Sequence, residues 1–172
     1  MFAKYNRHNN NLYNKLVNLS RNIFFYNKIM LKDSAETRVI LIFLHFSIVL
    51  IKHKSTSKIK FPQKIYDSIF LNIEYHLREE GLGDTSINKK MKNLNKIFYD
   101  ILLKINNSDN DKFKCNIDVL KKYLTDYLPL NTDKFVILSD YFNDFFNFCF
   151  DIDNDNMIEG RINFNYNQNG RT

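Results

Sequence analysis

The apolar run of residues 39–51 constrains the fold of this chain most strongly. His45 and Ser47 are its only polar members, and Arg38 and Lys52 bound it. A helix that crosses a membrane needs about 20 apolar residues, so this run is too short to span one. We therefore predict that it forms a buried helix at the centre of the domain. A helix lying in a membrane interface is the alternative interpretation.

Apolar residues recur at helical spacing in further segments of the 172-residue chain. The pattern is clearest in residues 84–105, where lysines and asparagines occupy the face opposite the apolar one. No internal repeat and no sustained strand alternation is present. The sequence predicts an all-α fold, a single compact bundle of about six helices, at residues 10–27, 33–53, 62–80, 84–105, 113–128 and 132–150.

The two ends of the chain differ from this helical region. Residues 1–9 are polar and are predicted to be a frayed N-terminus, while residues 10–150 form the helical domain. Residues 151–172 are rich in Asn, Asp and Gly, and this composition predicts a disordered polar C-terminal tail.

Two helix boundaries carry local signals. Asp33 is predicted to cap the helix of residues 33–53, with Glu36 closing a capping box. Gly81, Gly83 and Asp84 predict a structural turn, in which Gly81 ends one helix in a left-handed conformation and Asp84 caps the next.

Catalytic and ligand-binding motifs are not supported. No GxGxxG, P-loop, HExxH or GxSxG string occurs, so neither an enzyme nor a cofactor is predicted. The acids at 151, 153 and 155 resemble the start of a calcium loop, but Asn156 and Ile162 stand where Gly and Glu are required. Cys115 and Cys149 lack metal spacing and are predicted to be buried, reduced thiols.

The net charge of +6 favours anionic partners, although the bias toward Lys, Asn and Ile also suggests an A+T-rich genome. Lys89, Lys92 and Lys96 share one face of the helix at residues 84–105, with Lys90 beside them. Arg78 precedes the turn and could join this face. The face is either solvated or a docking surface for RNA or anionic lipid, and the charge pattern leaves both open.

Several separate motifs now agree in order and spacing with one family. An acid-rich helix start leads into an apolar run with an embedded histidine; a charged, glycine-containing turn follows, and then a lysine segment and an aromatic pair. These motifs are Asp33-Ser34-Ala35-Glu36-Thr37-Arg38, His45, Val49-Leu50, Leu77-Arg78-Glu79-Glu80-Gly81-Leu82-Gly83-Asp84-Thr85-Ser86, Lys89-Lys90-Met91-Lys92 and Phe98-Tyr99. Residues 11–103 thus resemble the ubiquinol–cytochrome c chaperone family.

The resemblance implies a non-enzymatic assembly chaperone for ubiquinol–cytochrome c reductase that binds newly made cytochrome b near the ribosome or the membrane surface. It further implies a small helper protein, transient contact with the inner membrane, and no DNA partner. The implied location is the cytoplasmic face of the inner membrane, or the mitochondrial matrix for a eukaryotic source.

Such a client requires an apolar groove rimmed by charge. The motif positions give the predicted partner-binding residues: Glu36, Arg38, His45, Arg78, Glu79, Asp84, Lys89, Lys90, Lys92 and Lys96. For His45, the residue pattern alone favours a hydrogen-bonded core histidine over a ligand. The alternative function is a ribosome- or RNA-binding or membrane-surface module that uses the basic face around Lys89–Lys96.

Overall fold

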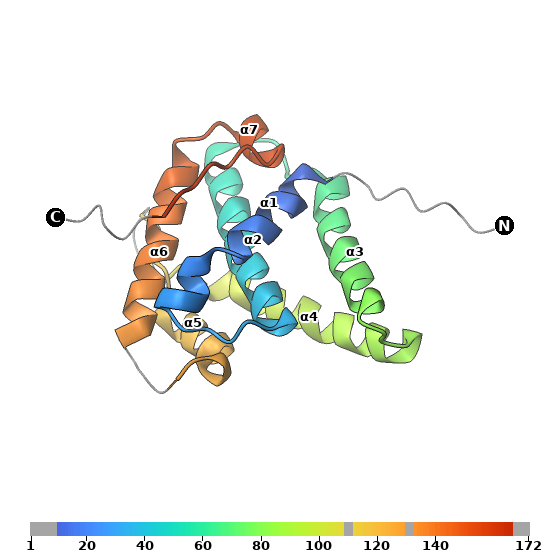
Figure 1. The fold of residues 1–172 in the computed structure, drawn as a ribbon. Coiled ribbons are helices and arrows are strands. Elements are labelled where there is room, and N and C mark those ends of the chain that lie inside the picture. The colour runs from blue at the N-terminus through green and yellow to red at the C-terminus, as the bar shows by residue number, and fades with distance from the viewer. Residues whose placement is uncertain (1–9, 109–111, 130–132, 167–172) are drawn as a thin grey trace.

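The longest helix, α2 (Ala35–Thr56), contains the apolar run and occupies the centre of the molecule, as predicted (Figure 1). The computed structural model describes residues 10–108, 112–129 and 133–166. Within these ranges the elements are helical, and the one β contact is an isolated bridge between Asn106 and Cys115. The all-α prediction is confirmed. No helix in the described part of the chain is both long enough and apolar enough to cross a membrane.

The start of α2 differs from the prediction. Ser34 is the N-cap, and its hydroxyl accepts a hydrogen bond from the Thr37 amide at 3.2 Å. Asp33 instead forms an ion pair with Arg38 at 2.8 Å. Asp and Ser are both good N-cap residues, so the sequence alone does not decide which of the neighbours Asp33 and Ser34 caps the helix.

The first predicted helix is interrupted. Helix α1 (Asn11–Ser20) ends at Ser20, and a π-helical turn, η1 (Phe24–Lys28), follows. The Asn22 side chain accepts a hydrogen bond from the Phe24 amide at 2.9 Å, which is the local side-chain bond that competes with a continuous helix.

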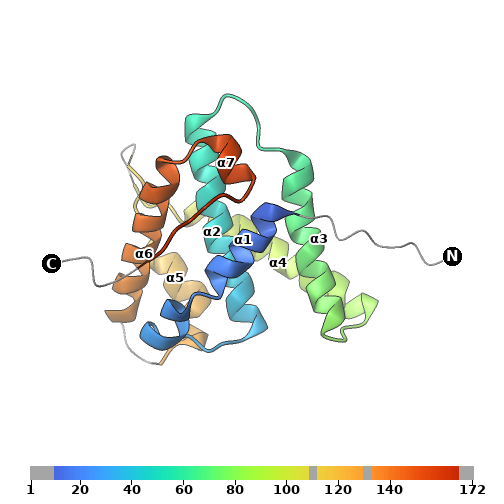
Figure 2. The ribbon, with the colours of Figure 1, turned by 45° about the horizontal axis from the view of Figure 1, so that its top comes forward.

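Helices α3 (Gln63–Glu79) and α4 (Asp84–Lys104) meet at a turn on the side of the molecule away from α6 (Asp133–Phe150) and diverge from it in a V, with α4 running back to pack against α2 (Figures 1 and 2). Gly81 lies in the turn between α3 and α4 with φ of +87°, the left-handed stop that the sequence predicts. The next helix, however, has Gly83 as its N-cap, and Asp84 is its first residue. Asp84 therefore does not cap α4 as predicted.

Helix α5 (Ile117–Leu124) and a 3₁₀ turn, η2 (Thr125–Tyr127), follow α4, and α5 packs against both α6 and α2. The aromatic inner face of α6 contributes Phe142 and Phe145 to the core, both fully buried. Cys115 and Cys149 are free and buried, as predicted, and burial raises the pKa of each thiol to about 12.

The prediction of a disordered tail after residue 150 is wrong for residues 151–166. Helix α7 (Asn154–Ile158) lies across the end of α2, and Met157 and Ile162 are buried. The ammonium group of Lys52 holds this segment by donating to the Ile152 carbonyl and, at 2.9 Å, to the Asn154 side chain. The polar composition of residues 151–172 suggested disorder, but a few apolar residues among them, including Met157 and Ile162, pack against the core. The predictions of a frayed N-terminus at residues 1–9 and of disorder at residues 167–172 fall outside the described residues.

Candidate functional site

An open apolar groove of about 250 Å³ lies between the N-terminal half of α2, the middle of α4 and the α5–η2 segment. Helix α2 supplies one wall, α4 supplies the other, and the C-terminal end of α3 contributes one leucine. The apolar lining consists of Ala35, Val39, Ile40, Leu77, Leu94 and Ile97. The combination of apolar lining and access to solvent suits an apolar peptide or helix.

Charged side chains rim this groove. Glu36 on α2 forms an ion pair with Lys90 on α4, with 3.5 Å between Oε1 and Nζ. A hydrogen bond from its own backbone amide, and then the charge of Lys90, lower the pKa of Glu36. Lys122 and Asp126 from the α5–η2 segment complete the rim. Positive and negative groups thus both surround the apolar lining.

A network around Asp100 fixes the α5 side of the groove to α4. Asp100 accepts hydrogen bonds from Lys104, from Lys122 at 2.6 Å and from the Tyr123 hydroxyl at 2.5 Å. Hydrogen bonds from Lys104, Lys122 and Tyr123, in that order, hold the pKa of Asp100 well below its usual range. Because two lysines and a tyrosine from two helices share one carboxylate, the groove wall is restrained at this point.

A second, smaller cavity of about 50 Å³ lies on the adjacent face of α2, toward α1 and α3. Arg38 lines it, while Ala35 and Val39 contribute to both hollows. Arg38 is about one-third exposed, and its guanidinium is held by Asp33. Among the predicted partner-binding residues, Glu36 and Lys90 therefore lie on the larger groove and Arg38 on the smaller cavity.

Arg78 has a local partner at each side of the turn. It contacts Glu74 at 2.8 Å within α3 and Asp84 at the start of α4. Both contacts are local to the turn between α3 and α4. Since two carboxylates engage Arg78, its role in this structure is to fasten the turn between α3 and α4.

His45 lies in the core, with no exposed surface, and is not placed to touch a partner directly. Its Nδ1 donates to the Leu41 carbonyl at 2.6 Å, so its Nε2 accepts from the Tyr141 hydroxyl at 2.8 Å. Burial lowers the pKa of His45 to about 4, partly opposed by the bond to Leu41. The prediction of a hydrogen-bonded core histidine is confirmed, and the prediction of partner contact is not supported by this position.

The remaining predicted residues are exposed but lie outside both hollows. Lys89, Lys92 and Lys96 project from α4 and form no ion pair within the described ranges. Glu79, the last residue of α3, is also exposed. The shared lysine face is thus present in the structure, and its occupant stays open.

The sequence did not indicate the residues that α5 and η2 bring to the groove. Lys122, Tyr123, Asp126 and Tyr127 line it. Their one sequence signal is the four-residue spacing of the two tyrosines, which places them on one helical face. That spacing gives no indication that the face meets α2 rather than solvent. The described residues contain no group of three or more His, Cys, Asp or Glu side chains placed to hold a metal ion.

Comparison with known proteins identifies the family. Fold and groove together define an all-helical protein with an open apolar groove rimmed by charge. A model of the ubiquinol-cytochrome C chaperone family matches residues 27–128. The chain therefore belongs to this family of chaperones, which confirms the resemblance read from its motifs.

The match to the family model begins within η1 and extends through η2, and so includes the whole groove. The crystal structure of the Cbp3 homolog from Brucella abortus has the same fold, with a TM-score of 0.66 and 22% sequence identity. The similarity covers 91% of this chain and 87% of that one. A comparison with curated proteins finds no match.

Proposed function

We propose that this protein is an assembly chaperone for ubiquinol–cytochrome c reductase that binds newly made cytochrome b in the groove between α2, α4 and η2. The observation that carries the proposal is an open apolar groove with a charged rim in a chain of this chaperone family. An unassembled membrane cytochrome exposes apolar helices and charged loops. The apolar lining of the groove suits such helices, and its charged rim suits such loops.

The Glu36–Lys90 pair gives the rim its selectivity. The side chains of Glu36 and Lys90 are 50% and 32% exposed, and their 3.5 Å separation is long for an ion pair. Either side chain can therefore leave this weak ion pair and pair with a charge on the client instead. A client segment with both a basic and an acidic flank would satisfy both residues. The ribosome, the small helper protein and the location at the inner membrane stay predictions.

Site-specific cross-linking during translation of cytochrome b tests the groove. A photoreactive amino acid at Ile97, which lines the groove, is compared with one at Tyr99, which lies on the opposite face of the same helix. We expect a cross-link to the nascent chain from position 97 and little from position 99. Equal labelling from both positions, or labelling from neither, would refute binding in the groove.

A charge placed in the groove tests the function in cells. Ile97→Asp should lower the level of assembled ubiquinol–cytochrome c reductase, while Tyr99→Asp should leave it near the wild-type level. Circular dichroism of both purified variants checks that each is folded. Normal reductase in cells that lack the protein would count against the whole proposal.

The exposed lysines of α4 support a second candidate, a contact with ribosomal RNA. Lys89, Lys92 and Lys96 carry three charges that no described side chain neutralises. Such a contact would weaken steeply with salt, and replacing one lysine would reduce the slope by about one unit. RNA binding without this salt dependence would exclude the lysine face as the binding surface.

A further inference from the structure

The connection between α2 and α3 presents an isoleucine to solvent. Ile59 is 79% exposed, and Lys58 and Lys60 on either side of it are exposed as well. The Ser57 hydroxyl donates to the Ile59 carbonyl at 3.3 Å and accepts from the Ile59 amide at 3.1 Å. Phe61 turns back to the core, where its ring meets His53 at 5.3 Å between centroids. Ile59 is thus held outward by a local turn while its neighbour anchors the loop.

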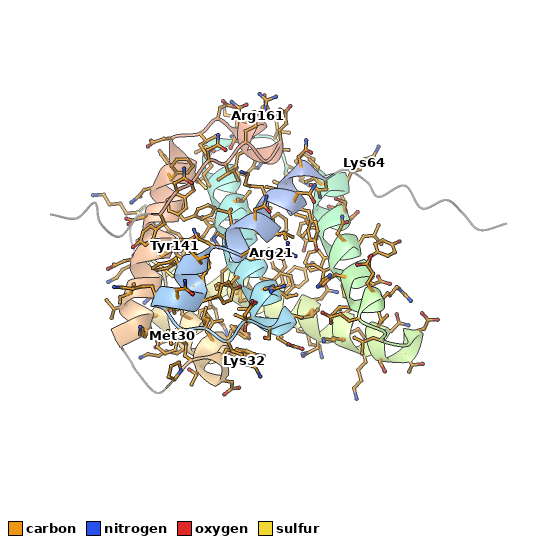
Figure 3. The ribbon with its side chains drawn as sticks, viewed as in Figure 1. Arg21, Met30, Lys32, Lys64, Tyr141 and Arg161 are labelled. Atoms are coloured by element: carbon orange, nitrogen blue, oxygen red, sulfur yellow. The ribbon has the colours of Figure 1, made fainter. Side chains whose placement is uncertain are left out.

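The charge around this loop has a single sign. No acidic residue occurs between Lys52 and Tyr66, and the exposed lysines of this stretch are Lys54, Lys58, Lys60 and Lys64. None of these four forms an ion pair within the described ranges. Figure 2 shows the loop as an arch at the edge of the molecule, and Lys64 lies at that edge in Figure 3.

Two acids on neighbouring elements, Asp67 on α3 and Asp153 at the start of α7, have partners of their own. Asp67 accepts a hydrogen bond from Gln63 at 2.7 Å, and Asp153 caps α7 by accepting from the Asn156 amide at 2.9 Å. Asp153 also lies close enough to Lys52 to influence its pKa. These acids therefore leave the outer lysines of the loop available to an anionic surface.

We propose that the α2–α3 loop docks on an anionic lipid surface, with Ile59 entering the interface and the four lysines meeting the headgroups. An aliphatic tip flanked by lysines suits a bilayer, because the tip loses water while the ammonium groups stay among phosphates. Lysines also bind RNA phosphates, but single-stranded RNA is held in addition by stacking of its bases on exposed aromatic rings. In residues 52–66 the exposed large apolar side chain is the aliphatic Ile59, and the rings of Phe61 and Tyr66 are partly buried. An aliphatic tip without an exposed ring favours lipid over nucleic acid.

The loop and the groove are separate surfaces. The groove involves the first turns of α2, from Ala35 to Ile40, whereas the loop follows Thr56 at its other end. A helix of 22 residues is about 33 Å long. Lipid docking and client binding can therefore occur together, and each can fail without the other.

Sedimentation with vesicles tests the proposal on the full chain. We expect binding to phosphatidylcholine vesicles that contain one-third phosphatidylglycerol and much weaker binding to phosphatidylcholine alone. Lys58→Ser with Lys60→Ser should lower the affinity roughly fivefold per lysine. Ile59→Ser should lower it roughly tenfold through the lost burial of the side chain.

Two variants outside the loop are matched controls. Lys112→Ser with Lys114→Ser removes the same charge at the same spacing from the connection between α4 and α5, where both lysines are exposed. Leu103→Ser removes an apolar side chain that is also 79% exposed. Both should bind anionic vesicles as the wild type does. Loss of vesicle binding in these controls as large as in the loop variants would overturn the proposal, as would a wild type that ignores phosphatidylglycerol. Preferential RNA binding lost in the loop variants would assign the loop to nucleic acid instead. Cross-linking to cytochrome b from position 97 measures client binding in the groove, and its result does not depend on whether the loop binds lipid.

Discussion

The buried pair of His45 and Tyr141 makes the stability of this protein depend on pH. In the folded state the pKa of His45 is lowered to about 4 by burial among aromatic rings, while an unfolded histidine titrates near 6.5. Between these two values the unfolded chain binds a proton that the folded chain does not. Stability from this group is therefore complete above the unfolded pKa and is lost as the pH falls toward 4.

The magnitude follows from the distance between the assay pH and the unfolded pKa. At about pH 5 this distance is roughly 1.5 units, and at about 1.36 kcal/mol per unit the loss is about 2 kcal/mol relative to neutral pH. His45 has no exposed surface, so solvent does not reduce this contribution to stability. His53 contributes in the same direction, because burial and then Lys52 lower its pKa.

Urea unfolding measured at neutral pH and at about pH 5 tests this prediction in the wild type and in His45→Gln. Glutamine cannot take up a proton, so the variant should lose about 2 kcal/mol less stability between the two conditions. Titration of the carboxylates is common to both proteins and cancels in the difference. Identical losses in both proteins would show that His45 does not become charged on unfolding in this range, which would refute the reasoning.

Three further predictions concern the contacts that hold the core and the last segment. Gly160→Ala should destabilise the protein by roughly 1–3 kcal/mol in thermal unfolding, because φ is +74° and a Cβ there would lie 2.5 Å from the Asn11 carbonyl oxygen. Gly83→Ala is the matched control. It should be nearly neutral, because nothing lies within 4 Å of the added Cβ. Lys52→Met should speed hydrogen exchange in residues 151–166 more than in α4, and equal protection in both would contradict the role of Lys52. Tyr141→Phe should cost about 1–3 kcal/mol in urea unfolding by leaving a buried histidine nitrogen unpaired, and an unchanged midpoint would count against that hydrogen bond.

Local sequence signals predicted much of the helical framework. The apolar run placed α2, the spacing of isoleucines and leucines placed α3 and α4, and Gly81 marked the stop between them. The same signals failed where two neighbouring residues compete for one task. Ser34 rather than Asp33 caps α2, and Gly83 rather than Asp84 precedes α4.

The candidate site was only partly visible in the sequence. Glu36 and Lys90 were singled out by their motif positions, and the structure brings them together across 54 positions in the chain. The tyrosines of α5 and η2 were missed, because their helical spacing is the same whether they face solvent or α2. The predicted lysine face of α4 is exposed, and whether it binds anything stays a prediction.

The sequence by itself determined that this chain is helical and that residues 39–51 lie at its centre, because helical periodicity and apolar content are local properties. Only the tertiary structure decided that His45 meets Tyr141 from 96 positions away, that α4 and η2 open a groove against α2, and that residues 151–166 fold. These outcomes depend on which surfaces meet when helices pack. The pairing of distant surfaces is fixed by the whole set of contacts rather than by any segment alone.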